Sequence, residues 1–111
     1  MTETEFLNLA EEMIVAIEDA LDECEVDIDV DNVGEVLTLI FENKTQVIIN
    51  KQTPLKQLWV AAKSGGYHFD FDEEKLRWVL ASDHTKNFCE CLNQYCSEQA
   101  GVAVDLRLEP E

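Results

Sequence analysis

The chain has 111 residues, 46% of them apolar, and a formal net charge of −16. This is enough apolar sequence for one globular domain with a single core. Residues 1–43 hold fourteen Asp and Glu and no Lys or Arg, whereas residues 44–111 hold ten acids and eight bases. The composition argues against nucleic acid as a partner, because phosphate binding needs a basic surface, and it favours metal cations or a basic protein surface.

The sequence carries no sign of membrane insertion or export. No apolar run approaches the roughly 18 residues of a membrane span. The first residues lack the basic and apolar segments of a signal peptide and the Arg-rich composition of a mitochondrial transit peptide. We therefore expect a cytoplasmic protein without a membrane partner, in which the four cysteines are reduced.

The first predicted element is an amphipathic helix that ends near Asp22 or Glu23. Thr2 and Glu5 have the spacing of a capping box, in which each side chain accepts a hydrogen bond from the other residue's backbone. Apolar residues then recur at intervals of three and four, namely Phe6, Leu9, Ala10, Met13, Ile14, Ile17 and Leu21. Acids in the last turn oppose the helix dipole, so the sequence accepts a local loss of stability there.

Six strands are predicted next. Residues 26–31 alternate strictly between apolar and acidic side chains, as a half-buried strand does. The other five are expected at residues 35–42, 45–50, 57–62, 67–71 and 76–80. The predicted turns lie at Asn32-Val33-Gly34, Asn43-Lys44, Ser64-Gly65-Gly66 and residues 72–75, and Pro54 interrupts the chain before the fourth strand.

The C-terminal part predicts a second helix and a final strand. Ser82 or Asp83 is expected to cap the helix, and Gly101 suits the position just past its end. The apolar stripe of this helix is Phe88, Cys89, Leu92, Cys96 and Ala100. The final strand is indicated by the alternation of Val102, Val104, Leu106 and Leu108.

This order of elements, joined by short turns, predicts an α+β fold. We expect a two-layer α/β sandwich in which the two helices pack on one face of a mainly antiparallel sheet. Side chains expected to face the helices are Leu37, Leu39, Phe41, Val47, Ile49, Leu58, Val60, Tyr67, Phe69, Trp78, Val104 and Leu106. Those expected on the open face are Val36, Thr38, Ile48, Asn50, Gln57, Trp59, His68 and Arg77.

Eight of the fourteen residues from 18 to 31 are acidic and none is basic. Such self-repulsion works against the compact state, which suggests a surface that meets something positive. Carboxylates are hard oxygen donors for divalent and trivalent cations. Alternate strand residues lie about 6.6 Å apart, so Asp27, Asp29 and Asp31 should form open, weak sites. On composition alone, a solvated face that only aids solubility explains the pattern equally well.

Other candidate sites are weaker. An EF-hand loop starting at Asp29 would place Val33 and Ile40 where oxygen ligands are required. Helical spacing puts Cys89 and Cys96 on one side and Cys91 on the other, so we expect a mixture of core and surface thiols. His68 and His84 are isolated, although His68 could serve as an auxiliary ligand on the open face. Neither a catalytic triad nor a paired-carboxylate cleft is visible, and no enzymatic activity is expected.

The central segment carries a specific motif. Residues 50–61 read Asn, Lys, Gln, Thr, Pro, Leu, Lys, Gln, Leu, Trp, Val, Ala, and Gly65-Gly66-Tyr67-His68-Phe69 follow. This closely resembles the frataxin signature of Asn, a basic residue, Gln, any residue, Pro, two of any, Gln, an aliphatic residue, Trp, any residue, and Ala or Ser. The element order and the acidic first helix and strand extend the resemblance to one frataxin-like domain over residues 1–111. The short N-terminus and the expected cytoplasmic location resemble the bacterial branch of the family.

The resemblance implies a function. Frataxins are iron-binding proteins of iron–sulfur cluster assembly that contact the cysteine desulfurase and its scaffold protein, so the chain is expected to donate iron or regulate assembly. It implies weak surface sites for Fe²⁺ or Fe³⁺, in which other divalent or trivalent cations can substitute, and a monomer in the absence of metal. The expected metal ligands are Glu18, Asp19, Asp22, Glu23, Asp27, Asp29 and Asp31. The expected partner-binding residues are Asn50, Gln57 and Trp59.

Two alternatives remain at this point. The chain could be an acidic interaction module that inhibits a basic protein, with metal binding incidental. It could also be an enzyme that oxidises iron at its acidic surface.

Overall fold

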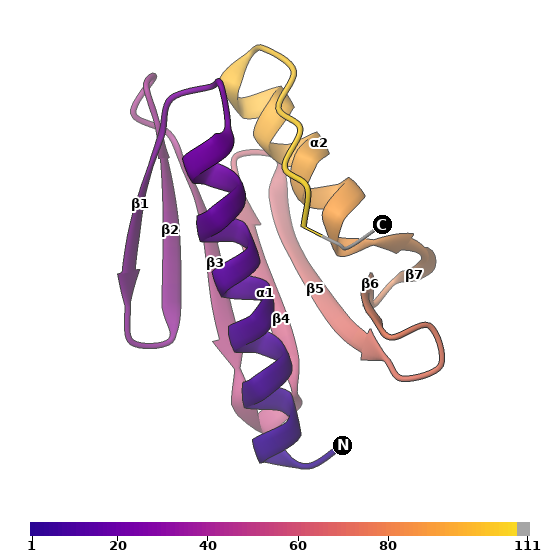
Figure 1. Cartoon of the computed structure of the whole chain (residues 1–111). Helices are drawn as coiled ribbons and strands as arrows, with labels where there is room; N and C mark the ends of the chain where they lie inside the picture. Colours follow the sequence, from indigo (N-terminus) through magenta and orange to yellow (C-terminus); the bar gives the residue numbers. More distant parts are fainter. Residues whose placement is uncertain (109–111) are drawn as a thin grey trace.

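The computed structural model describes residues 1–108 and places two helices on the same face of a seven-stranded antiparallel sheet (Figure 1). This confirms the predicted α+β sandwich; residues 109–111, which the predicted domain includes, lie outside the described part. A short 3₁₀ turn, η1, precedes the fourth strand. The elements are α1 (Glu3–Glu23), β1 (Ile28–Val33), β2 (Val36–Phe41), β3 (Gln46–Gln52), η1 (Thr53–Leu55), β4 (Gln57–Ala62), β5 (Gly65–Asp72), β6 (Arg77–Leu80), β7 (Asp83–Asn87) and α2 (Phe88–Ala100).

Helix α1 begins and ends as the sequence predicts. The Thr2 side chain accepts from the Glu5 backbone N–H at 3.1 Å, and the Glu5 carboxylate accepts from the Thr2 N–H at 2.9 Å. Its buried stripe packs on the sheet, where the Phe6 ring meets Trp78 edge to face with centroids 5.9 Å apart. Within residues 1–108, neither helix is long and apolar enough to cross a membrane.

The strands form a meander in which each pairs with the next in sequence. The first turn differs from the prediction because Gly34, with φ at +60°, starts a two-residue turn with Glu35. Val33 therefore stays paired with Val36, and β1 covers Ile28–Val33 instead of residues 26–31. The Asn43-Lys44 turn is confirmed: Lys44 has φ of 73° and donates its backbone N–H to the Phe41 carbonyl at 2.9 Å.

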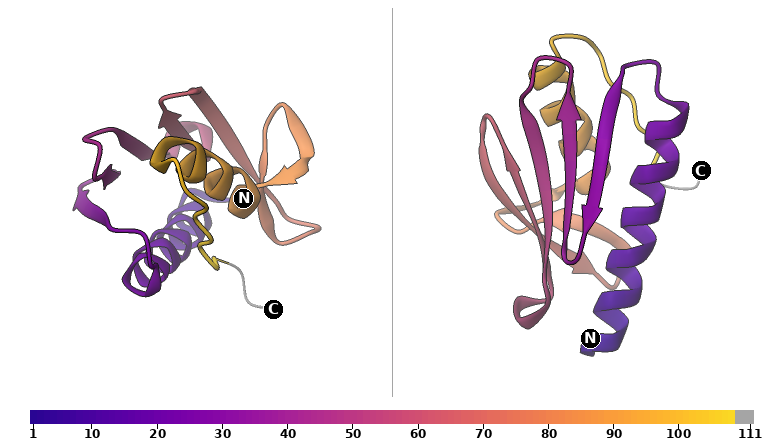
Figure 2. Two further views of the ribbon diagram at one scale, coloured as in Figure 1. Left: turned by 90° about the horizontal axis from the view of Figure 1, so that it is seen from above. Right: turned by 90° about the vertical axis from the view of Figure 1, so that its left-hand side faces the viewer.

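The alternation of side chains along the strands correctly predicted which face of the sheet each residue occupies. The residues predicted to face the helices are buried, except that Tyr67 is only half-buried. The residues predicted on the open face are half-buried or, for His68, exposed. Figure 2 shows the sheet with both helices on one side of it, so the opposite face has no second layer among the described residues.

The predicted start of the second helix was wrong. Residues Asp83–Asn87 form β7, and α2 begins at Phe88 with Asn87 as its N-cap. The Asp83 carboxylate accepts hydrogen bonds from the N–H and hydroxyl of Thr85, a local turn that competes with helix capping. The Asn87 side chain instead accepts from the Glu90 N–H at 2.9 Å. Gly101 ends the helix with φ of 75°, as predicted.

The predicted last strand is also wrong, although its alternation is real. Residues 103–108 are extended but belong to no sheet, and Val104, Leu106 and Leu108 are buried. Their backbone pairs with α2 side chains instead: the Leu106 N–H donates to Asn93 Oδ1 at 2.7 Å, and the Val104 N–H donates to Ser97 Oγ at 2.8 Å. The segment runs between the two helices (Figure 1), so helices rather than a strand satisfy its period-two pattern.

The buried face of α2 is wider than predicted. Cys91 and Tyr95 are buried, whereas Cys89 and Ala100 are only half-buried. The Tyr95 ring stacks on Tyr67 of β5 at 4.2 Å between centroids. Because this stack brings the Cys91 side of α2 against the sheet, the prediction that Cys91 points away from the core was wrong.

Candidate functional site: an acidic ridge and an open sheet face

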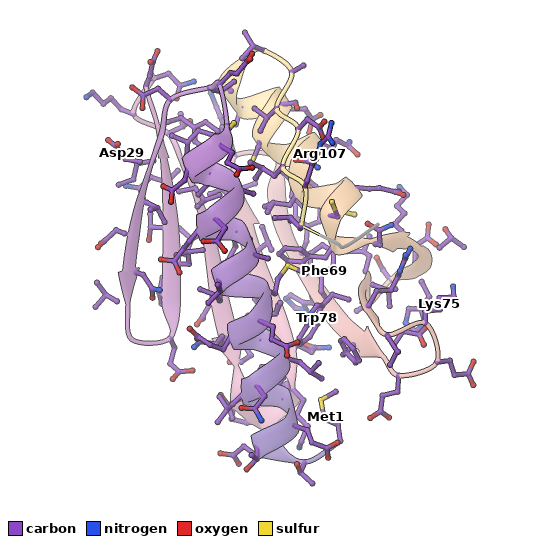
Figure 3. All side chains as sticks on the ribbon, in the orientation of Figure 1. Met1, Asp29, Phe69, Lys75, Trp78 and Arg107 are labelled. Carbon is purple, nitrogen blue, oxygen red and sulfur yellow. The ribbon has the colours of Figure 1, made fainter. Side chains whose placement is uncertain are left out.

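The seven predicted metal ligands occupy two neighbouring elements and the loop between them. We call them the acidic ridge, which comprises Glu18, Asp19, Asp22, Glu23, Asp27, Asp29 and Asp31. The first four lie on the C-terminal half of α1, Asp27 is in the connecting loop, and the last two are on β1. Glu18 is half-buried and the other six are exposed. Figure 3 shows Asp29 on the outer side of β1, directed away from the core.

The ridge carboxylates have no partners within residues 1–108. None of them accepts a hydrogen bond or forms an ion pair there. The last turn of α1 contains no basic residue that would offset the negative end of the helix dipole. No ion pair among the described residues offsets the mutual repulsion of the ridge, and a bound cation or a basic surface would relieve it.

The ridge is open rather than convergent. Among the described residues, no group of three or more Asp, Glu, His or Cys side chains is arranged closely enough to hold one metal ion. Asp19 and Glu23 turn toward a hollow of about 360 Å³ between α1 and the extended segment, which also contributes Asp105 and Arg107. An ion on this surface would have few protein ligands and would keep most of its water, which favours weak and rapidly exchanging binding.

The predicted partner-binding residues lie together on the open face of the sheet. Asn50 on β3 is directly opposite Trp59 on β4, and both are half-buried. The Trp59 indole N–H donates to the side-chain oxygen of Gln57 at 2.8 Å, and the Gln57 amide donates in turn to Asp70 at 2.9 Å. These bonds fix the orientation of the indole on the uncovered face.

Two further residues of this face were not among the predicted partner-binding residues, although His68 was considered as an auxiliary ligand. His68 stacks on Trp59 with centroids 4.1 Å apart and planes 10° from parallel, and Asp70 ends the hydrogen-bonded chain. Both follow from the β4–β5 register, in which Trp59 pairs with His68 and Gln57 with Asp70. Placing the turn at residues 63–64 would have revealed both pairs from the sequence.

Two of the four thiols, Cys91 and Cys96, are buried. Burial raises the pKa of the Cys96 thiol to about 12 and also raises the pKa of Cys91, so both stay protonated near neutral pH. Cys89 is half-buried and donates to the Leu106 carbonyl at 3.5 Å. The four cysteines are unbridged.

Comparison with known proteins identifies relatives of the whole chain. A family model described as "Frataxin-like domain" matches residues 1–102. The iron–sulfur cluster assembly protein CyaY of Pseudomonas aeruginosa is 50% identical over 105 residues, covering 95% of this chain and 96% of that protein. CyaY of Pseudomonas fluorescens is 43% identical over 105 residues, covering 95% and 94%. The solved structure of a frataxin from Psychromonas ingrahamii aligns with a TM-score of 0.86 at 34% identity, covering 96% of this chain and 99% of that one.

Proposed function

The chain belongs to the frataxin family, and on that premise we propose that it acts in iron–sulfur cluster assembly as an iron-binding protein that docks on the cysteine desulfurase and its scaffold. In this proposal iron is a cargo rather than a resident cofactor. The protein modulates assembly, as iron donor or as regulator, and catalyses no reaction of its own.

The observation that carries the proposal is the unpaired acidic ridge. Seven carboxylates on α1, β1 and their connecting loop have neither hydrogen bonds nor ion pairs within residues 1–108. Hard cations bind carboxylate oxygens well, and open sites with few protein ligands release them readily. Both properties suit a protein that must pass iron on.

In the proposal, the open sheet face around Trp59 is the second surface that contacts the partner complex. The Trp59 side chain is held by Gln57 and stacked on His68, on a sheet face that neither helix within residues 1–108 covers. Tryptophan is enriched among the residues that dominate interface energies, and a pre-oriented ring loses little entropy on binding. In this proposal the ridge binds metal and docks in a basic groove of the partner complex. Asn50, Gln57 and Trp59 form a second contact with the assembly machinery.

One observation favours a second candidate. Because no three donor side chains converge among the described residues, the ridge suits a broad basic protein surface as well as it suits a metal. The chain would then be an acidic interaction module that inhibits a basic protein, and iron binding would be incidental.

The test is a cysteine desulfurase assay on the complete desulfurase–scaffold complex, with and without ferrous iron, using the unmodified chain and Asp19→Lys/Asp22→Lys. The proposal expects an effect of the unmodified chain that depends on iron and is lost in the variant. An effect of equal size with and without iron would favour the interaction module. Oxygen consumption faster than that of free ferrous iron would favour an iron-oxidising enzyme and contradict the proposal.

A further inference from the structure

The sheet ends in two edge strands, β1 and β7, which differ in the regularity of their pairing. At the β7 edge the pairing with β6 is broken by a register shift between Val79 and Leu80, and such irregularity discourages another strand from adding. The β1 edge is regular, since all six of its residues, Ile28 to Val33, pair in register with β2. It contains neither a bulge nor a proline, so its charged side chains are the one feature that discourages another strand from pairing with it.

The outer edge of β1 is unpaired in the described residues. The strand order ends at β1, and β2 is its one neighbour there. The right-hand view of Figure 2, taken from this side, shows β1 in front with no element covering it. An exposed row of backbone N–H and C=O groups is a template for a further strand.

The hairpin turn determines which backbone groups face outward. Gly34 and Glu35 form a two-residue turn, which pairs the Val33 carbonyl with the Val36 N–H. In an antiparallel ladder the bonded residues alternate, so Asp29 and Asp31 bond to β2 like Val33. The backbone groups of Ile28, Val30 and Asn32 then point away from the sheet.

The side chains around this edge restrict what can add to it. Asp29 and Asp31 flank Val30, and both are exposed and without an ion pair in residues 1–108. Val30 itself is 41% exposed. A second copy of β1 would set like charges opposite one another, which destabilises a strand pair, whereas basic side chains at those positions would stabilise it. The carboxylates thus reject self-pairing and select a basic strand.

We infer that β1 accepts an extended segment of a basic partner protein as an additional antiparallel strand, with basic residues opposite Asp29 and Asp31 and an apolar residue against Val30. The inference rests on the proposed function, since the partner is the basic surface on which the ridge docks. It adds that docking includes backbone pairing in a fixed register, which charge attraction alone does not provide.

The probe is a blocked seven-residue peptide that alternates Lys and Val, beginning and ending with Lys. Its matched control carries Pro for the central Val, which keeps the charge but removes a backbone donor. With the first peptide at ten times its Kd, amide exchange at Ile28, Val30 and Asn32 should slow about tenfold. The amides of Asp29 and Asp31, already bonded to β2, should change little, and the control peptide should protect none of the five.

Two variants of the chain test the same point from the other side. Val30→Pro removes one outward N–H at an edge position where proline is tolerated, and Val30→Ala trims the side chain but keeps that donor. Val30→Pro should lose about tenfold or more in affinity for the peptide, because a missed register forfeits several bonds at once, while Val30→Ala should stay close to the parent. Cobalt line-broadening at the ridge should be the same in both. If Val30→Pro does not fold, the exchange pattern in the unmodified chain decides alone.

The inference is overturned if both peptides bind alike, if protection shows no alternation along β1, or if β1 amides become protected with protein concentration alone, which would indicate a second copy. Binding of the desulfurase–scaffold complex is measured in parallel. If the chain binds this complex but its β1 amides show no alternating protection, only the strand-addition inference is wrong. If the chain does not bind the complex, the proposed docking is wrong as well.

Discussion

The acidic ridge and the open face around Trp59 differ in how their side chains are held. Ridge carboxylates have no partners in residues 1–108. On the open face, by contrast, Asp70, Gln57 and Trp59 form a hydrogen-bonded chain and His68 stacks on the indole. One surface is therefore defined by its charge and the other by its shape.

This difference predicts different kinds of recognition. Exposed charges act over about 8 Å at physiological ionic strength and tolerate many geometries, so binding at the ridge should be fast, sensitive to salt and unselective among hard cations. A fixed aromatic ring demands a complementary pocket and responds weakly to salt. Changes on one surface should leave the other intact.

Reversing ridge charge should have the largest effect. In Asp19→Lys/Asp22→Lys, two carboxylate ligands become cations, so most ferrous and cobalt binding should disappear. Each lost close charge pair is worth on the order of 1–4 kcal/mol, or about fivefold or more in affinity. The measurement is NMR line-broadening by cobalt, or by ferrous iron without oxygen.

A matched control separates local from global charge. Glu74→Lys/Glu98→Lys alters the net charge equally at two exposed positions outside the ridge and should retain binding. If broadening in the unmodified chain maps to His84 and the cysteines, the ridge assignment is wrong.

Truncating the two tryptophans should give unequal losses of stability. Trp59→Ala removes one aromatic stack and one hydrogen bond, each worth about 0.5–1.5 kcal/mol. Trp78 is 3% exposed and contacts Phe6 and Phe71, so Trp78→Ala should cost about 3–5 kcal/mol. Denaturant unfolding measures both.

Trp59→Ala should also weaken binding to the desulfurase–scaffold complex and leave cobalt broadening at the ridge unchanged. Equal destabilisation by the two substitutions would make Trp59 a structural residue. Undiminished binding of the complex would remove Trp59 from the partner surface.

The sequence predicted those features that depend on local periodicity. The α1 stripe, its capping box, the side-chain parity of the strands and the position of Trp59 on the open face all follow from repeats of 3.6 or 2. The same periods placed six of the seven ridge residues on α1 and β1, whereas Asp27, predicted on the first strand, lies in the loop before β1. The family resemblance rests on a contiguous motif, which a linear reading can detect.

The errors lie where hydrogen bonds and strand register, which the side-chain pattern does not reveal, decide the structure. Residues 103–108 alternate like a strand, but Asn93 and Ser97 of α2 supply their hydrogen bonds, and no local pattern reveals that. Asp83 resembles a helix cap until its turn with Thr85 and the pairing of β7 are known. The stack of His68 on Trp59 needed the strand register, which depends on a turn that was predicted at residues 64–66 and lies at residues 63–64.

Divalent cations should stabilise the fold through the ridge by a moderate amount. A ligand that binds only the folded state at ten times its Kd adds about 1.4 kcal/mol, or roughly 5 °C in melting temperature. The comparison is between a divalent chloride and sodium chloride at equal ionic strength, because salt alone also screens the repulsion. Asp19→Lys/Asp22→Lys should show little of the divalent effect, and an unchanged melting temperature in the unmodified chain would count against a metal site.

The smallest effect should come from Gln57→Ala, which touches the open face without removing its aromatic ring. The substitution leaves the Trp59 N–H and the Asp70 carboxylate without the bonds they now share with Gln57. Because both groups are only half-buried, water can replace Gln57, and the loss of stability should be about 1 kcal/mol or less. The indole loses its fixed orientation, however, so binding of the desulfurase–scaffold complex should weaken more than stability does.

Gln52→Ala is the control for this substitution, since Gln52 pairs with Gln57 across β3 and β4 but does not bond to Trp59. Tryptophan fluorescence anisotropy would report the freed indole, against the constant contribution of buried Trp78. If Gln57→Ala and Gln52→Ala bind the complex equally well, the hydrogen-bonded chain does not orient Trp59 for recognition. The open face would then not be defined by the fixed shape of its side chains, because the indole would contribute to binding only through its exposed area.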